Sequence, residues 1–186
     1  YKKFVDPEFK MGGMVEHMVG LLALRMANAE IIPYNINRYA FDLNLHFKNA
    51  TKKIKEFNLN FMGFVKTIDA IRALKKTSES LTNEISILLK TNNLSNKKIK
   101  SINHQLIALE KSFISEKGMY FGSWYKSLYA ASDPFSGYAA WILPGVEYEI
   151  ALKSSDRLEE WDIRYANAIL SLKTKMDNLS LEINTN

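Results

Sequence analysis

The sequence contains no cysteine. Disulfide bonds, thiolate metal sites and a cysteine nucleophile are therefore excluded. Histidine is scarce as well: His17, His46 and His104 fall on three different predicted helices, and none has a second histidine or an acid four residues further on. A zinc site built on a helix commonly draws two of its ligands from one face. We therefore expect no metal ion and no other cofactor within this chain.

Long apolar runs are missing too. A membrane-spanning helix needs roughly 20 consecutive apolar residues, and the most apolar stretch, residues 18–27, is interrupted by Arg25. We therefore expect no membrane span in this chain. No serine lies in a nucleophile elbow and no glycine-rich loop matches a phosphate cradle, so nothing indicates an enzyme complete within these residues.

The net charge is +5, but the lysines that produce it do not form one stripe. They cluster at residues 52–55, 75–76 and 97–100, on three separate segments and among Asn, Ser and Thr. A nucleic-acid surface needs basic residues gathered on one face, with base-reading or stacking groups between them. Solvated helix faces are the better interpretation, so nucleic acid is not an expected partner.

The chain starts on Tyr1, and no charged-then-apolar leader follows it. We therefore expect a processed protein or a fragment of a longer one. The sequence leaves the compartment open, with an exported (periplasmic or extracellular) protein favoured over a cytoplasmic one.

Apolar residues recur every three or four positions along most of the chain, which is typical of amphipathic helices. No segment alternates strongly with a period of two, and there is no internal repeat. The pattern predicts an all-α fold, a bundle of four long antiparallel helices plus a short helix. Residues 14–29 are apolar around so much of the circumference that we expect that helix to be central. The helices are expected near residues 14–29, 35–57, 61–89, 95–113, 144–152 and 156–178, with a frayed tail at 179–186.

One segment, residues 114–143, does not fit the helical pattern. It lies between the fourth long helix and the short helix, and it is rich in tyrosine, tryptophan and phenylalanine. Disordered segments are poor in aromatic residues, so we expect an ordered loop presented by the helices. Tyrosines on such a loop suit a binding surface or a domain interface, because each buries a large face and keeps a polar tip. A loop merely anchored by its own aromatic residues is an equal alternative.

A second set of residues is a candidate for an interface. Arg25 interrupts an apolar helix, where it is either an interface anchor or an arginine at the edge of the core. Met18 and Met26 on the same helix fill a core or an interface. Trp161 and Tyr165, on the apolar stripe of the last helix, complete the set.

Several stretches occur in an order that resembles a known family. They are FVDPEF, LALRMANAEIIPYNINRYA, INHQLIALEKSFI, then LYA, GYA and LPGVEYEI within and after the aromatic loop. The chain resembles the transferrin receptor-like dimerisation domain, the C-terminal helical domain of the glutamate carboxypeptidase II family of zinc peptidases. The resemblance covers essentially the whole chain. It implies that residues 1–186 form a single dimerisation domain, with residues 1–10 leading in from an upstream peptidase domain.

The resemblance also implies a function. This domain would be non-catalytic, the zinc would be held by the upstream domain, and the partners would be a second copy in a two-fold homodimer, the upstream domain and the C-terminus of a peptide substrate. In the family a lysine–tyrosine pair of the loop binds the substrate carboxylate. The tyrosine falls on Tyr138, but the lysine falls on Gly137, so an acidic C-terminal residue is put in doubt. An aminopeptidase, a carboxypeptidase of other specificity, a catalytically inactive receptor-like relative and a self-standing helical binding module stay open.

Overall fold

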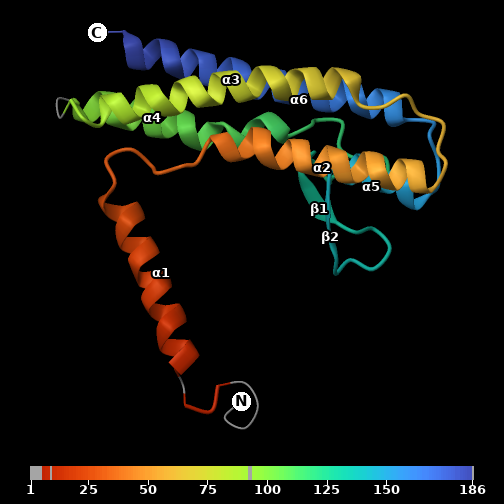
Figure 1. The fold of residues 1–186 in the computed structure, drawn as a ribbon, viewed down its shortest axis with the longest axis horizontal. Helices are drawn as coiled ribbons and strands as arrows, with labels where there is room; N and C mark the ends of the chain where they lie inside the picture. Colours follow the sequence, from red (N-terminus) through yellow and green to blue (C-terminus); the bar gives the residue numbers. More distant parts are fainter. Residues whose placement is uncertain (1–5, 9, 92–93, 186) are drawn as a thin grey trace.

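The computed structural model describes residues 6–8, 10–91 and 94–185 (Figure 1). Residues 1–5 and 9, on which the FVDPEF stretch partly falls, lie outside the described residues. The described elements are α1 (Lys10–Asn28), α2 (Asn37–Glu56), α3 (Val65–Leu88), α4 (Asn96–Ala108), a 3-10 turn η1 (Glu110–Phe113), β1 (Ala130–Ser132), β2 (Ala140–Ile142), α5 (Pro144–Ala151) and α6 (Leu158–Asn184).

The helices α2, α3, α4 and α6 lie side by side and form the bundle (Figure 1). Each buries one stripe of residues at helical spacing, as the sequence predicts. On α2 the buried stripe is Ala40, Leu43, Phe47, Ala50 and Ile54, which steps by three or four residues. Phe47 packs edge to face against both Phe64 and Tyr165, so α2 and α6 meet through aromatic contacts. The all-α bundle is confirmed.

The direction of one helix pair differs from the antiparallel expectation. Thr67 bonds to Asp162, Thr77 to Asp177 and Glu84 to Ser180, so sequence numbers rise together along α3 and α6. The two helices therefore run parallel. Parallel neighbours need a long connection, and here it is formed by α4, the aromatic loop and α5. The helices α2 and α4 run in the opposite direction (Figure 1).

The first helix is not central within this chain, contrary to expectation. None of the residues of α1 is buried, and Met18 and Leu22 are exposed by 62% and 61%. The helix projects away from the bundle (Figure 1). Its exit point is fixed, because the Asn103 side chain of α4 accepts a hydrogen bond from Ile32 N (2.9 Å) and donates one to Glu30 O (2.8 Å). Ile31 and Ile36 anchor the linker in the core.

The start of α3 is capped from a distant element. Asp162 of α6 is buried, and its carboxylate oxygens accept hydrogen bonds from Thr67 N (2.8 Å) and Lys66 N (3.1 Å). A carboxylate at this position satisfies helix-terminal N–H groups that have no partner within the helix. At its far end α6 continues to Asn184 with Leu179 and Ile183 buried, so it is ordered six residues beyond the expected end at Asn178.

Candidate functional site

The aromatic loop ends in a β-hairpin that leaves the bundle (Figure 1). Strands β1 and β2 are antiparallel, with Ala131 opposite Trp141 at the centre of the register. Short alternating segments of three residues escape period-two detection, so the sequence did not predict these strands. The hairpin presents residues 133–139 as its tip, and this tip holds Tyr138.

A single carboxylate organises the tip. Oδ1 of Asp133 accepts hydrogen bonds from Phe135 N (2.6 Å) and Ser136 N (3.2 Å), and Oδ2 accepts one from the Ser136 hydroxyl. The hydroxyl and backbone donors hold the pKa of Asp133 below its usual range. Gly137, at φ +74°, donates its N–H to Asp133 O at 2.9 Å. A positive φ favours glycine, so this residue closes the turn that sets the direction of Tyr138.

Tyr138 is 99% exposed, the highest exposure among the large hydrophobic residues described. Its side chain therefore makes almost no contact within the chain, although its backbone N–H lies 3.4 Å from the Ser136 hydroxyl. An exposed ring on an ordered turn is available to a ligand or to another domain. The prediction that Tyr138 binds substrate remains a prediction.

The first half of the loop is clamped to α6 by an arginine. Arg164 donates hydrogen bonds to Gly118 O (2.7 Å) and Ser115 Oγ (2.9 Å), and its guanidinium lies 4.2 Å from the centroid of the Trp161 ring. Gly118 has φ +67°, and a Cβ there would lie 2.3 Å from Ser123 O, so only glycine fits this turn. The loop that leads to the hairpin thus has a rigid base.

An aromatic cluster packs against the hairpin tip. Phe135 lies 5.8 Å from Trp141 and 6.3 Å from Tyr148 between ring centroids, while Phe121 lies 6.2 Å from Trp141 and 5.1 Å from Tyr148. These four residues come from the loop, the tip, β2 and α5. Their packing couples the hairpin to the first turns of α5.

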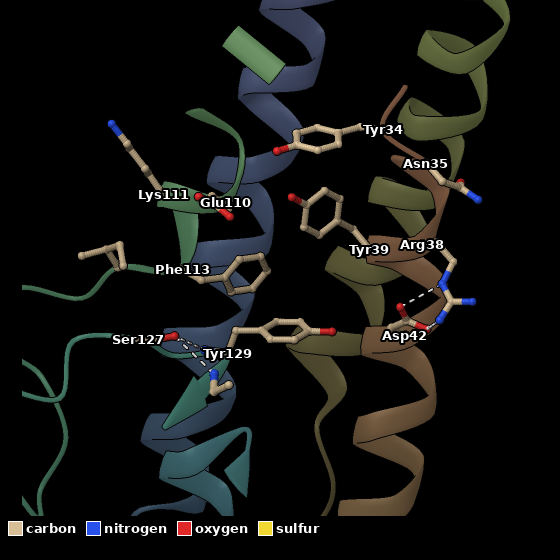
Figure 2. Close-up of a pocket in the computed structure, with 12 residues that line it drawn as sticks. Tyr34, Asn35, Arg38, Tyr39, Asp42, Glu110, Lys111, Phe113, Ser127 and Tyr129 are labelled. Carbon is tan, nitrogen blue, oxygen red and sulfur yellow. Dashed lines mark hydrogen bonds and ion pairs between the residues drawn. The ribbon is translucent and has the colours of Figure 1, made fainter. Parts of the chain in front are cut away.

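A cavity of about 540 Å³ lies beside the base of the hairpin. Figure 2 shows Tyr34, Tyr39, Phe113 and Tyr129 around it, between α2 and the end of η1. Burial is the main reason why the pKa values of Tyr39 and Tyr129 are raised. Arg38, one of the two cationic residues that line the cavity, pairs with both oxygens of Asp42 at 3.0 and 2.8 Å. The surface of the cavity is mainly apolar, and it opens where the linker from α1 joins α2.

The sequence-predicted site residues do not come together. Tyr138 and Gly137 lie at the hairpin tip, whereas Met18, Arg25 and Met26 lie exposed on α1. The prediction of an interface position is wrong for two residues. Trp161 and Tyr165 are 0% exposed, because the apolar stripe of α6 faces the core. Neither can contact a partner.

Sequence reasoning missed the residues that build the loop. Asp133 carried a signal, because Asp-Pro-x-Ser-Gly is a turn composition in which the aspartate bonds nearby backbone N–H groups. Arg164 carried no such signal, because its hydrogen-bond partners Ser115 and Gly118 lie 49 and 46 residues away in the sequence. Within residues 6–8, 10–91 and 94–185, no three His, Asp or Glu side chains are placed to hold a metal ion. In the same ranges, no helix has the length and apolar content needed to cross a membrane.

These features define a helical domain that presents one ordered hairpin. Residues 59–177, more than half of the chain, match the family described as transferrin receptor-like dimerisation domain, and the chain belongs to that family. The resemblance found from the sequence motifs is confirmed.

Two relatives from Arabidopsis thaliana are similar to the chain. One, named probable glutamate carboxypeptidase LAMP1, is 26% identical over 146 residues, which cover 78% of this chain and 20% of that protein. The other, named probable glutamate carboxypeptidase AMP1, is 24% identical over 168 residues, which cover 88% of this chain and 24% of that protein. The chain thus spans between a fifth and a quarter of the length of these relatives.

Proposed function

We propose that the chain is a non-catalytic homodimerisation domain of a zinc exopeptidase of the glutamate carboxypeptidase II type. Its hairpin completes the substrate pocket of a peptidase domain that precedes it in the full-length protein. The observation that carries this proposal is that α1 and the hairpin project from the same side of the bundle (Figure 1). A domain placed on that side touches both. Family membership and the relatives' names support this arrangement.

The preceding domain is the proposed occupant of the α1 surface. The large apolar side chains of α1 spread over more than half of its circumference, and glycine and alanine occupy much of the remainder. A helix of this composition is normally covered on more than one side. The chain spans 20–24% of the relatives' length, so most of a protein of that size lies outside it. A surface on the same chain docks at high effective concentration, which favours it over a separate partner.

The second copy is assigned to a different surface, on α6. Ile163, Leu170 and Leu181 are spaced by seven and eleven residues, so they fall on one line along the helix. They are exposed by 43%, 44% and 67% in a helix whose other stripe lies in the core. A two-fold contact places the same line of both copies together. A stable interface of standard size buries roughly 800 Å² per partner, which a 27-residue helix and its neighbours can supply.

Sedimentation velocity over a wide concentration range tests both assignments. Every buried apolar residue that the structure describes lies between Ile31 and Ile183, so residues 31–186 hold this core without α1. We expect residues 1–186 and residues 31–186 both to form dimers at low micromolar concentration. Leu170→Glu is expected to shift either form to monomer, whereas Leu152→Glu, a substitution at a 46% exposed position after α5, leaves the dimer intact. Loss of the dimer on removal of α1 would instead make α1 the two-fold contact.

Tyr138 is the residue proposed to touch the substrate. Its phenol would donate a hydrogen bond to the C-terminal carboxylate of the peptide, a role that needs both its full exposure and the fixed turn at Asp133 and Gly137. Among the described residues no three His, Asp or Glu side chains are placed to hold a metal ion, and we assign the zinc and the catalytic steps to the preceding domain.

The variant Tyr138→Phe in the full-length protein tests this role. Losing one hydrogen bond to a charged group costs about 0.5–3 kcal/mol, which corresponds to roughly a two- to hundredfold fall in kcat/KM. Tyr34→Phe, at a 45% exposed tyrosine of the α1–α2 linker, is the matched control and is expected to change nothing. Peptide affinity measured by calorimetry extends the test to an inactive receptor-like relative. Unchanged kinetics and affinity in Tyr138→Phe would remove the residue from the substrate site.

A further inference from the structure

The hairpin has no cation. Between residues 130 and 142 the sequence holds neither lysine nor arginine, and its only charged residue is Asp133. Hydrogen bonds from the tip stabilise the ionised carboxylate of Asp133, so the tip is anionic at neutral pH. An acidic substrate side chain beside Tyr138 would meet a like charge and no counter-charge from the hairpin.

Two lysines beside β2 have carboxylate partners. Lys52 and Lys53 of α2 line a cavity beside β2 together with Ala140 and Trp141. Lys53 Nζ lies 2.8 Å from both carboxylate oxygens of Glu147, and Lys52 Nζ lies 3.8 Å from Glu56. An acidic ligand would have to displace these carboxylates.

The tip offers an apolar surface in place of a cation. Phe135 is 66% exposed and separated from Tyr138 by two small residues. Its ring packs against Trp141 and Tyr148, and these contacts hold the ring in place. A supported aromatic ring with a free face suits an aliphatic or aromatic side chain.

We propose that the pocket completed by this hairpin selects peptides whose C-terminal residue is apolar rather than acidic, with Phe135 contacting that residue. This inference rests on the proposed function, because it takes Tyr138 to bind the adjacent carboxylate. Gly137 leaves an open position beside that carboxylate, since a Cβ built there would meet no atom within 4 Å. The charge and shape of the tip therefore set specificity at the terminal residue.

The test uses the full-length protein supplied with Zn²⁺ and three N-acetylated dipeptides that differ only in a C-terminal leucine, phenylalanine or glutamate. We expect kcat/KM for leucine and phenylalanine to exceed that for glutamate by about 10- to 100-fold, the range typical of selection by an apolar pocket. Phe135→Ala is expected to lower kcat/KM for the two apolar substrates by about tenfold, through KM, and to leave glutamate unchanged. Phe41→Ala is the matched control, because Phe41 is 63% exposed on the α3 side of α2.

A gain-of-function variant completes the design. Gly137→Lys places a cation at the open position. Because a lysine at φ +74° is strained and can shift the turn, the measured quantity is the ratio of kcat/KM for the glutamate peptide to kcat/KM for the leucine peptide, which is expected to rise about tenfold or more. A wild-type preference for glutamate, or an equal effect of Phe135→Ala on all three peptides, overturns the inference and leaves the proposed function standing. No cleavage and no calorimetric binding of any of the three peptides overturns the proposed function itself.

Discussion

Replacing Trp161 with alanine is expected to lower the free energy of unfolding by about 3–5 kcal/mol, the usual cost of removing a large aromatic side chain from a core. Trp161 is fully buried and contacts several elements. The Tyr120 ring lies 5.8 Å away, and a Cβ on Gly145 would lie 2.6 Å from the indole carbons, so the first turn of α5 rests directly on the ring. Equilibrium unfolding in urea measures the change.

The matched control is Trp124→Ala. Trp124 lies in the aromatic loop and is 73% exposed, so its removal is expected to change stability by less than about 0.5 kcal/mol. The pair of variants separates a core role from an interface role. If Trp161 were an interface residue, its removal would weaken the dimer and leave the unfolding of the monomer unchanged, and that result would contradict the burial of its ring.

Periodicity predicted the bundle because the core is built from helix stripes. The spacing of Leu43, Phe47 and Ile54 on α2 alone fixes which face is buried. It could not fix which helices are neighbours or how they run. The parallel alignment of α3 and α6 depends on contacts between residues about 100 positions apart, such as Thr77 with Asp177.

The helix α1 shows that composition can predict burial without identifying the surface that covers the helix. Its apolar circumference predicts burial, and within this chain the helix is exposed. The two observations agree if the covering surface belongs to another part of the full-length protein. The same reasoning failed for Trp161 and Tyr165, because an apolar stripe does not tell whether its partner is the chain's own core or a second copy.

The hairpin tip was predicted only in part. A dense run of aromatic residues with Pro134 and Gly137 indicated an ordered, presented loop. The turn that exposes Tyr138 depends on hydrogen bonds to one carboxylate, Asp133, and these follow from local turn chemistry rather than from periodicity. The turn composition around Asp133 was the available signal in the sequence. It points to Asp133 as the residue that positions Tyr138, the candidate ligand contact.

Removing the guanidinium of Arg157 is the second change with a large expected effect. Glu149 of α5 is 0% exposed, and its Oε1 accepts a hydrogen bond from Arg157 Nε at 2.7 Å. The other oxygen, Oε2, has no hydrogen-bond partner among the described residues. Arg157→Ala leaves this buried carboxylate without its counter-charge, which typically costs about 3–5 kcal/mol. We expect the lower end, about 3 kcal/mol, because the Arg157 side chain is 32% exposed and solvent screens the pair.

A double-mutant cycle shows whether the charge pair or the packing of Arg157 holds this region. The guanidinium also lies 4.5 Å from the centroid of the Tyr120 ring, so it joins the aromatic loop to α5 and α6. Glu149→Leu combined with Arg157→Ala removes both charges and is expected to recover most of the stability lost in Arg157→Ala, as measured by urea unfolding. Arg72→Ala is the control: its pair with Asp69 is exposed by 73% and 65%, and the expected change is within about 0.5 kcal/mol.

If the double variant recovers nothing, the contact with Tyr120 is what fixes the base of the hairpin. Peptide selection by the tip should then fall with Tyr120→Ala, although neither residue touches the tip.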